Sequence, residues 1–168
     1  MTRVALGLTA LALLVAPLLA NSARNAPPQL AGLKSIWVLV TSENISGLDD
    51  AQLKRDVEAH LRKAGLQPQQ EGGSPTLFLG ITYSKSAECP GAVFLKVSLS
   101  LSERVRLARN RKLTDFRAAT WEQTEVTIVG EADAAAEAQN RALQLVDYFA
   151  DSVVYTTSVY AKRATGKP

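Results

Sequence analysis

A run of alternating residues near the middle of the chain constrains the fold more than any other feature. Apolar side chains take every second position of this run, and mostly polar ones lie between them: Val93, Leu95, Val97, Leu99 and Leu101 alternate with Phe94, Lys96, Ser98 and Ser100. Successive side chains of a strand point to opposite faces, so a period of two predicts a strand. One face of this strand belongs to a core and the other is largely in contact with water.

The strand is predicted to be half of a long hairpin. Its alternation continues to Leu107, but Glu103 interrupts the apolar row, which indicates that the strand outgrows the core or carries a bulge. A turn follows at 109–115, and 116–129 returns as the partner strand. Two earlier strands are predicted at 35–41 and 76–84. The first is apolar on both faces, which favours a central place in the sheet.

Two helices complete the predicted fold. Asp49 caps a helix over 50–64, and Gly65 ends it with Leu66 in the position of a Schellman contact. Residues 67–75, rich in proline and glycine, read as a loop, and an alanine-rich stripe after Gly130 predicts the second helix. The order strand, helix, three strands, helix predicts an α+β two-layer sandwich. We expect a four-stranded mixed sheet with both helices on one face.

The N-terminal residues indicate export. Arg3 precedes an apolar run over 4–20 that ends in small residues, the pattern of a cleavable signal peptide over 1–23. An uncleaved membrane anchor is the alternative, and Pro17 with the polar residues beyond the run argues against it. The single cysteine, Cys89, does not follow the run, so no lipid anchor is expected there. We therefore expect an exported protein, periplasmic in a Gram-negative cell or secreted.

Length and charge limit the remaining interpretation. Residues 24–33 read as an extended leader, 34–160 as a single α+β domain and 161–168 as a flexible tail. The formal net charge of the whole chain is +3, far below the dense positive charge that phosphate backbones require. No nucleic-acid partner is expected.

The chain has few residues suited to catalysis. His60, the single histidine, lies between the polar and apolar stripes of the 50–64 helix with no evident partner, and reads as a boundary residue rather than a base. The acidic pairs at 49–50 and 131–133 stand at helix starts, where carboxylates favour the helix dipole. No catalytic, cofactor or metal site is predicted. An enzyme with an unrecognised site remains the alternative, because distant residues can converge in a fold.

Basic residues form the clearest charge concentration. Six of them fall within fourteen residues of the long hairpin and are expected to cluster at one end of it: Arg104, Arg106, Arg109, Arg111, Lys112 and Arg117. Lys96 is expected to share the wet face of the third strand with Arg104 and Arg106, as a further member of the same candidate surface. Such a tip could bind anionic lipid head groups, lipopolysaccharide or an acidic envelope protein. The alternative is that these charges only keep a long strand edge soluble and prevent strand addition.

Two further candidate surfaces come from aromatic residues and the cysteine. Trp37, Phe78, Phe94 and Trp121 could form an apolar patch on the face away from the helices, although membership of the core is an open alternative. Cys89 lies in a turn-like stretch and is a candidate free thiol that joins two chains or senses oxidants, unless it is a loop residue without a role.

Three segments carry a resemblance to known proteins. Leu61-Arg62-Lys63-Ala64-Gly65-Leu66, Ala119-Thr120-Trp121 before Gly130, and Leu145-Val146-Asp147-Tyr148-Phe149 resemble an uncharacterised family of exported proteins of Gram-negative bacteria. The element order also resembles LptE-like small periplasmic sandwich domains, whose lipid-bearing cysteine is absent here. The resemblance implies a compartment and a fold, and no activity.

Together these features predict a non-catalytic exported module that binds an envelope component or assists envelope assembly. Its partner is expected to be an envelope protein or an anionic lipid. A structural homo-oligomer that forms through an exposed strand edge is a further alternative.

Overall fold

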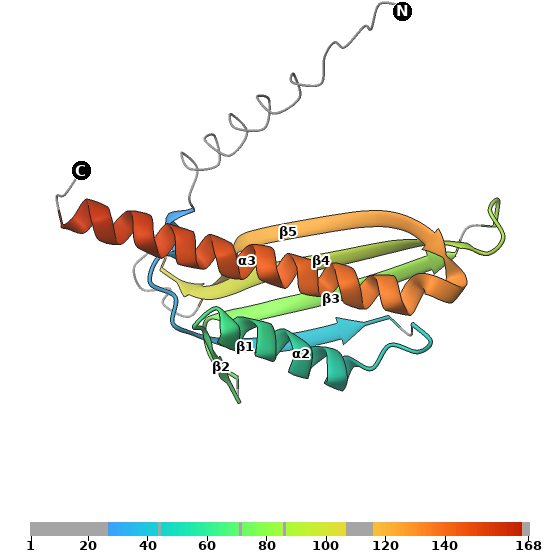
Figure 1. Ribbon diagram of the computed structural model, residues 1–168, viewed down its shortest axis with the longest axis horizontal. Helices are drawn as coiled ribbons and strands as arrows, with labels where there is room; N and C mark the ends of the chain where they lie inside the picture. The colour runs from blue at the N-terminus through green and yellow to red at the C-terminus, as the bar shows by residue number, and fades with distance from the viewer. Residues whose placement is uncertain (1–26, 44, 71, 86, 107–115, 166–168) are drawn as a thin grey trace, which may run out of the picture.

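Five strands and two α-helices form a two-layer α+β sandwich (Figure 1). The computed structural model describes residues 27–43, 45–70, 72–85, 87–106 and 116–165. The elements are η2 (Pro28–Leu30), β1 (Ser35–Ser42), α2 (Asp50–Lys63), β2 (Gln67–Gln69), β3 (Thr76–Lys85), β4 (Ala92–Val105), β5 (Phe116–Gly130), η3 (Glu131–Asp133) and α3 (Ala134–Ala164). The predicted signal peptide lies outside the described residues, as do Arg109, Arg111 and Lys112.

The strands form one mixed sheet in the order β2-β1-β3-β4-β5, and both helices lie on the same side of it (Figure 1). β1 runs parallel to β2 and β3, whereas β3, β4 and β5 are antiparallel neighbours. The predicted fold class, the central place of the first strand and the one-sided helices are confirmed. The predicted strand count of four is wrong, because the sheet has five.

The fifth strand is β2, in a segment that was predicted to be a loop. It pairs Ser35 with Gln67, and Gln67 N also donates to the carbonyl oxygen of Lys34 at 2.9 Å. The strand is three residues long and contains Pro68. Neither its length nor its composition gives a period-two pattern, so only pairing with β1 defines it.

Both predicted ends of α2 are confirmed. The Asp49 carboxylate accepts hydrogen bonds from the backbone N–H groups of Ala51, at 2.8 Å, and Gln52, at 3.1 Å. At the other end Gly65 adopts a φ of 85°, and Leu66 N donates to the Leu61 carbonyl oxygen at 3.0 Å, which is the Schellman bond. Local hydrogen bonds therefore set the length of this helix.

The long hairpin carries a bulge opposite the region of Glu103, but the bulge lies in β5 and not in the strand of Glu103, where it was predicted. Leu101 pairs with Trp121 but Ser102 pairs with Ala119, so Thr120 is the extra residue. The Thr120 hydroxyl donates to the Glu103 carboxylate at 2.7 Å. The residue that interrupts the apolar row thus holds the bulge.

Two chain-end predictions differ from the structure. Part of the expected leader, 24–33, forms the 3-10 turn η2, whose Leu30 is fully buried and packs in the core. Gly32 N also donates to Thr157 Oγ1 of α3 at 3.0 Å. At the C-terminal end α3 continues to Ala164, into the segment that was expected to be a tail. The expected leader is ordered because the Leu30 side chain is buried in the core and the Gly32 N–H bonds to α3.

The core lies between the sheet and the helices. It is built from the apolar faces of β1, β3 and β4, including Leu77, Leu79 and Leu95, and from the apolar stripes of α2 and α3; Trp121 and Val129 of β5 pack against it partly buried. Ala138 and Ala142 are fully buried and let α3 approach the sheet closely, while Phe149 fills the wider space further along.

Candidate functional site

The face of the sheet away from α2 and α3 carries no covering element in the described part of the chain, and we call it the open face. Its residues alternate along each strand with residues that face the helices: Trp37, Leu39 and Thr41 of β1, Phe78, Gly80, Thr82 and Ser84 of β3, Phe94, Lys96, Ser98, Ser100 and Ser102 of β4, and Glu122, Thr124, Val126 and Ile128 of β5. The alternation of 93–101 predicted this face.

One apolar group on the open face comes from β1 and β3, and we call it the β1–β3 patch: Trp37, Leu39 and Phe78. Leu39 lies directly opposite Phe78 and is 36% exposed. A Cβ at Gly80 would lie 3.0 Å from Cε1 of Phe78. Gly80 therefore leaves the space that the Phe78 ring occupies.

A second apolar group comes from β4 and β5, and we call it the β4–β5 patch: Phe94, Val126 and Ile128. Phe94 pairs with Ile128, and Lys96 pairs with Val126. The three side chains are 43%, 67% and 62% exposed. At about 3.3 Å per residue, Phe94 lies about 20 Å along the strands from the row of Phe78. The predicted aromatic patch is therefore two separate patches.

Trp121, the fourth predicted member, lies on the other face. Its indole ring packs against Phe149 of α3 with the ring centroids 5.1 Å apart, and it lies 6.4 Å from the ring of Tyr148. The assignment of Trp121 to the open-face patch is wrong, and the alternative of core membership is correct. The bulge at Thr120 changes the alternation just before this position, so sequence parity alone could not place it.

Hydroxyl groups fill the space between the two patches. Gly80, Ser98 and Thr124 lie in one row across β3, β4 and β5, and Thr82 and Ser100 flank that row. Ser98 Oγ donates to the Gly80 carbonyl oxygen at 3.2 Å. The middle of the open face is thus polar, and its apolar surface is confined to the β1–β3 patch and the β4–β5 patch.

The described basic residues do not form one cluster. Arg104 lies directly opposite Arg117 at one end of the hairpin, and Arg106 is exposed just beyond β4. Lys96 lies eight residues before Arg104, about 26 Å along the strand, and pairs with Val126. Lys96 therefore lies beside the β4–β5 patch, apart from the basic residues at the end of the hairpin.

Cys89 is exposed, as expected of a turn residue. Its carbonyl oxygen accepts a hydrogen bond from Ala92 N at 3.1 Å, in the turn between β3 and β4 where Gly91 has a φ of 82°. The candidate free thiol is accessible at this end of the sheet, and its role stays a prediction.

An ion pair links this same end of the sheet to η3. Lys85 donates to the Glu131 carboxylate, and the Tyr83 hydroxyl donates to the same oxygen at 3.3 Å. The hydrogen bond from Lys85 holds the pKa of Glu131 below its usual value, and the same bond raises the pKa of Lys85. The acidic start of η3 is therefore tied to β3.

His60 has a partner that the sequence did not indicate. Its Nδ1 lies 2.6 Å from the Asp147 carboxylate of α3, beside a shallow hollow between the two helices. The described residues that line this hollow also include Lys63 and Asp151, and none of them carries a hydroxyl or thiol nucleophile. The two residues are 87 positions apart, so only packing of α2 against α3 brings them together.

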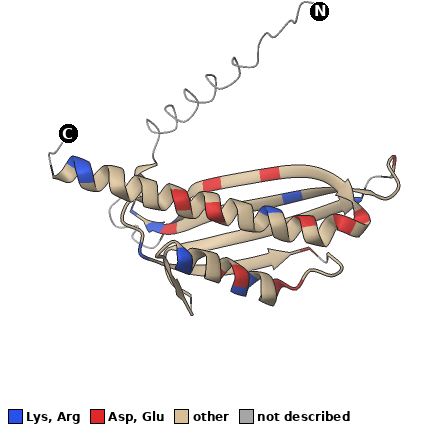
Figure 2. Cartoon of the chain, viewed as in Figure 1, with Lys and Arg blue, Asp and Glu red and all other residues tan. Residues whose placement is uncertain are grey.

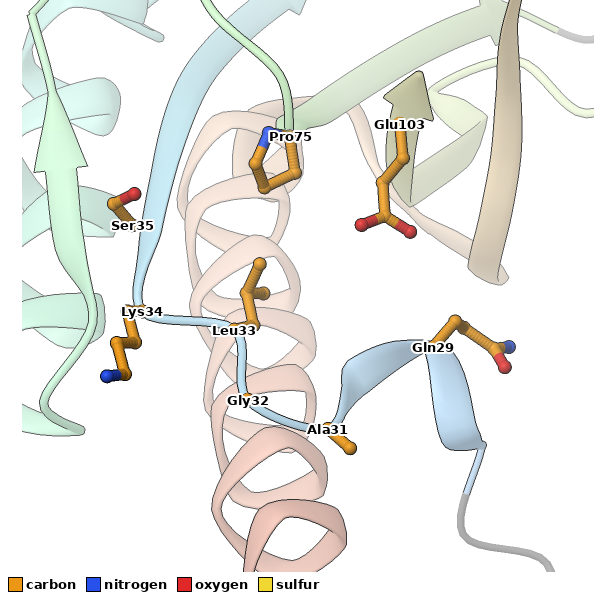
Figure 3. Close-up of a pocket in the computed structure, with 8 residues that line it drawn as sticks. All are labelled: Gln29, Ala31, Gly32, Leu33, Lys34, Ser35, Pro75 and Glu103. Atoms are coloured by element: carbon orange, nitrogen blue, oxygen red, sulfur yellow. The ribbon is translucent and has the colours of Figure 1, made fainter. Parts of the chain in front are cut away.

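A second hollow, of about 300 Å³, lies where η2 meets the ends of β1 and β4. Figure 3 shows the Glu103 carboxylate pointing into it and the Lys34 side chain pointing away. Because Glu103 already accepts a hydrogen bond from Thr120, its charge has a structural role at the bulge. The open shape and mixed lining of this hollow indicate no particular ligand.

Two kinds of feature are absent from the described residues. No group of three or more His, Cys, Asp or Glu side chains lies close enough together to hold a metal ion. None of the described helices has the length and apolar character needed to cross a bilayer.

Comparisons with known proteins give only remote likenesses. No family model matches the chain, and no curated protein matches its sequence. A PelC dodecamer from Paraburkholderia phytofirmans is similar at 12% identity with a TM-score of 0.41, over 73% of this chain and 87% of the other. A minor lipoprotein from Acinetobacter baumannii is similar at 12% identity with a TM-score of 0.32, over 78% and 95% of the two chains.

A lipoprotein from Caulobacter crescentus is similar at 12% identity and a TM-score of 0.30, over 84% of this chain and 97% of the other. These likenesses are too remote to assign a function. The resemblance to LptE-like domains stays a prediction.

Proposed function

We propose that this protein is a non-catalytic binding module of the Gram-negative envelope and that it holds an anionic amphiphile on its open face. The observation that carries the proposal is the β4–β5 patch, where three apolar side chains are between 43% and 67% exposed beside Lys96. An apolar surface next to a cation suits a molecule with an acyl chain and a phosphate. Both phospholipids and lipopolysaccharide have this chemistry.

The arrangement of the face supports this proposal. Phe94, Val126 and Ile128 offer contact area for an acyl chain, and the lysine pairs with Val126 in the sheet. Burying one such side chain contributes about 1.5–3 kcal/mol. Three of them together give enough contact area for measurable affinity.

The test is binding to vesicles. We expect the protein to float with phosphatidylglycerol vesicles and to bind phosphatidylcholine vesicles less. Phe94→Ser should weaken binding at least about tenfold, because about 1.4 kcal/mol corresponds to a tenfold change in Kd. Lys96→Ser should remove most of the preference for the anionic lipid and its dependence on salt. Lipopolysaccharide micelles in place of vesicles separate the two sources of the ligand.

The control is Val154→Ser, because Val154 is 53% exposed on α3, away from the open face. Phe94 is also partly exposed, so neither variant should alter the melting temperature strongly. Equal binding by Phe94→Ser and Val154→Ser would refute the proposal.

The basic end of the hairpin is a second surface to which an anionic lipid could bind. Its contribution to vesicle binding is therefore tested separately from that of the β4–β5 patch. Arg106→Ser with Arg117→Ser removes two exposed cations far from Phe94. If this double variant loses vesicle binding while Phe94→Ser keeps it, the hairpin end binds the lipid and the patch does not. The opposite result supports the patch.

A further inference from the structure

The outer edge of β5 is the longest unpaired strand edge in the described part of the molecule. β5 spans 15 residues, pairs only with β4 and contains no proline. At the opposite edge of the sheet β2 is only three residues long and carries Pro68. Short strands and prolines protect edges against strand addition, and β5 has neither device. The two edges therefore differ in their capacity to accept another strand.

Part of this edge already has a partner. Gln29 Nε2 donates to the Thr120 carbonyl oxygen at 2.7 Å, at the bulge. Beyond the bulge the strand runs regularly from Trp121 to Gly130. α3 packs chiefly on β4 and leaves the outer side of β5 uncovered. The segment open to a further strand is therefore 121–130.

The charges near the two ends of β5 favour a second copy of this chain as the added strand. Arg117 is the second residue of the strand, and Glu131 and Asp133 of η3 follow its end. Figure 2 shows acidic positions where β5 leads into α3. Glu131 is already paired with Lys85, so Asp133 is the acidic residue that a second copy would meet. In an antiparallel pair the start of one strand meets the end of the other. Two copies of β5 would therefore place the basic end of each beside the acidic end of its mate, twice across one two-fold axis.

We propose that this protein forms a two-fold dimer through antiparallel pairing of β5 with β5, centred on Val126. In this register Val126 lies opposite itself, Thr124 lies opposite Ile128, and Glu122 lies opposite Gly130, which has no side chain. Val126, the most exposed apolar residue of the strand, then packs on its own copy at the axis, and Ile128 is a diagonal neighbour of the second Val126. This proposal concerns the edge and stands independently of ligand binding on the open face.

Neighbouring registers are less favourable. A centre at Glu125 or at Glu122 places two carboxylates directly opposite each other, which destabilises a strand pair. A centre at Thr124 sets Val126 against Glu122. In the proposed register Glu125 faces Thr127, and its own charge is already paired with Arg141 at 3.4 Å.

The register is tested by disulfide trapping in a Cys89→Ser background. The protein used is the full chain, as it is purified after expression. Directly opposed residues of an antiparallel pair have Cα atoms about 4.5–5.5 Å apart, within the range of a disulfide. We expect Val126→Cys to form a covalent dimer on mild oxidation. Thr127→Cys, one residue away, is the matched control and should stay largely reduced, because it faces Glu125 of the second copy.

Association is tested by light scattering and sedimentation over a concentration series. We expect Val126→Lys, which sets two ammonium groups opposite each other, to raise the dimer dissociation constant at least tenfold. Val154→Lys, at a similarly exposed position on α3, should leave it unchanged. If the protein stays monomeric up to about 100 µM in these measurements, the dimer is refuted. Cross-linking that is strongest at Thr127, or an oligomer that Val126→Lys leaves intact, also overturns the proposal.

Discussion

Trp37 and Trp121 lie on opposite faces of the same sheet, and their removal should have unequal effects. Trp121 packs between β5 and Phe149, whereas Trp37 is on the open face. We expect Trp121→Ala to lower the free energy of unfolding by about 3 kcal/mol, because it leaves a void beside α3. Trp37→Ala should lower it by about 1 kcal/mol, since less of its contact is lost. Urea denaturation of both variants measures the difference, and equal losses would contradict the assigned faces.

The Lys85–Glu131 pair gives a prediction about acid. Because the hydrogen bond from Lys85 lowers the pKa of folded Glu131, its stabilising contribution is complete above the unfolded pKa and is lost as the pH falls through the folded pKa. Both groups are exposed, so the effect on stability is small. Carboxyl NMR titration should show the pKa of Glu131 moving upward in Lys85→Met. An unchanged titration would show that the ion pair does not persist in solution.

Among the elements, α2 and α3 begin differently, although an aspartate stands before each. Asp49 accepts two backbone hydrogen bonds, but Asp133, the N-cap of α3, makes no side-chain cap bond. We expect Asp49→Ala to lower the free energy of unfolding by about 1 kcal/mol. Asp133→Ala is the matched control and should cost only a few tenths, from loss of charge at the helix start. Thermal and urea unfolding measure both, and equal effects would contradict the role of the cap.

The elements also differ in how far the sequence predicts them. α2 follows from capping residues and an apolar stripe that lie within 17 residues of one another, from Asp49 to Gly65, and β4 follows from its own alternation. β2 does not, because its three residues gain strand geometry only by pairing with β1. Leu30 likewise falls in the segment that was predicted to be an extended leader. Its burial depends on contacts with elements distant in the chain, among them α3.

For the whole molecule, the proposed dimer predicts a pattern of amide exchange. Outward-pointing N–H groups of 121–130 have no strand partner among the described residues of one copy and should exchange quickly with solvent. Pairing with a second copy should slow their exchange as protein concentration rises, and Val126→Lys should abolish that dependence. Hydrogen-exchange mass spectrometry on the β5 peptide measures it, with the β2 peptide as an internal control. Exchange that is independent of concentration would contradict strand pairing.

The candidate sites depended on the whole molecule to different degrees. Alternation along β4 correctly placed Phe94 on the open face, because it uses only the parity of one strand. Parity also puts Lys96 on this face, and its distance from Arg104 along β4 separates it from the basic end of the hairpin. The partnership of His60 with Asp147 had no local signal at all, as the two residues meet only where α2 packs on α3.

The sequence by itself determined the α+β class, the span of α2, the pairing of the two long hairpin strands, and a sheet with one wet face. Each of these rests on side-chain periods and on hydrogen bonds between residues close in the chain. The tertiary structure alone decided that β2 joins the sheet, that Trp121 turns to the helices, and that β5 lies at the edge of the sheet with 121–130 unpaired on its outer side among the described residues. These depend on which distant strands pair and where a single bulge shifts the register, because long-range contacts rather than local pattern set them.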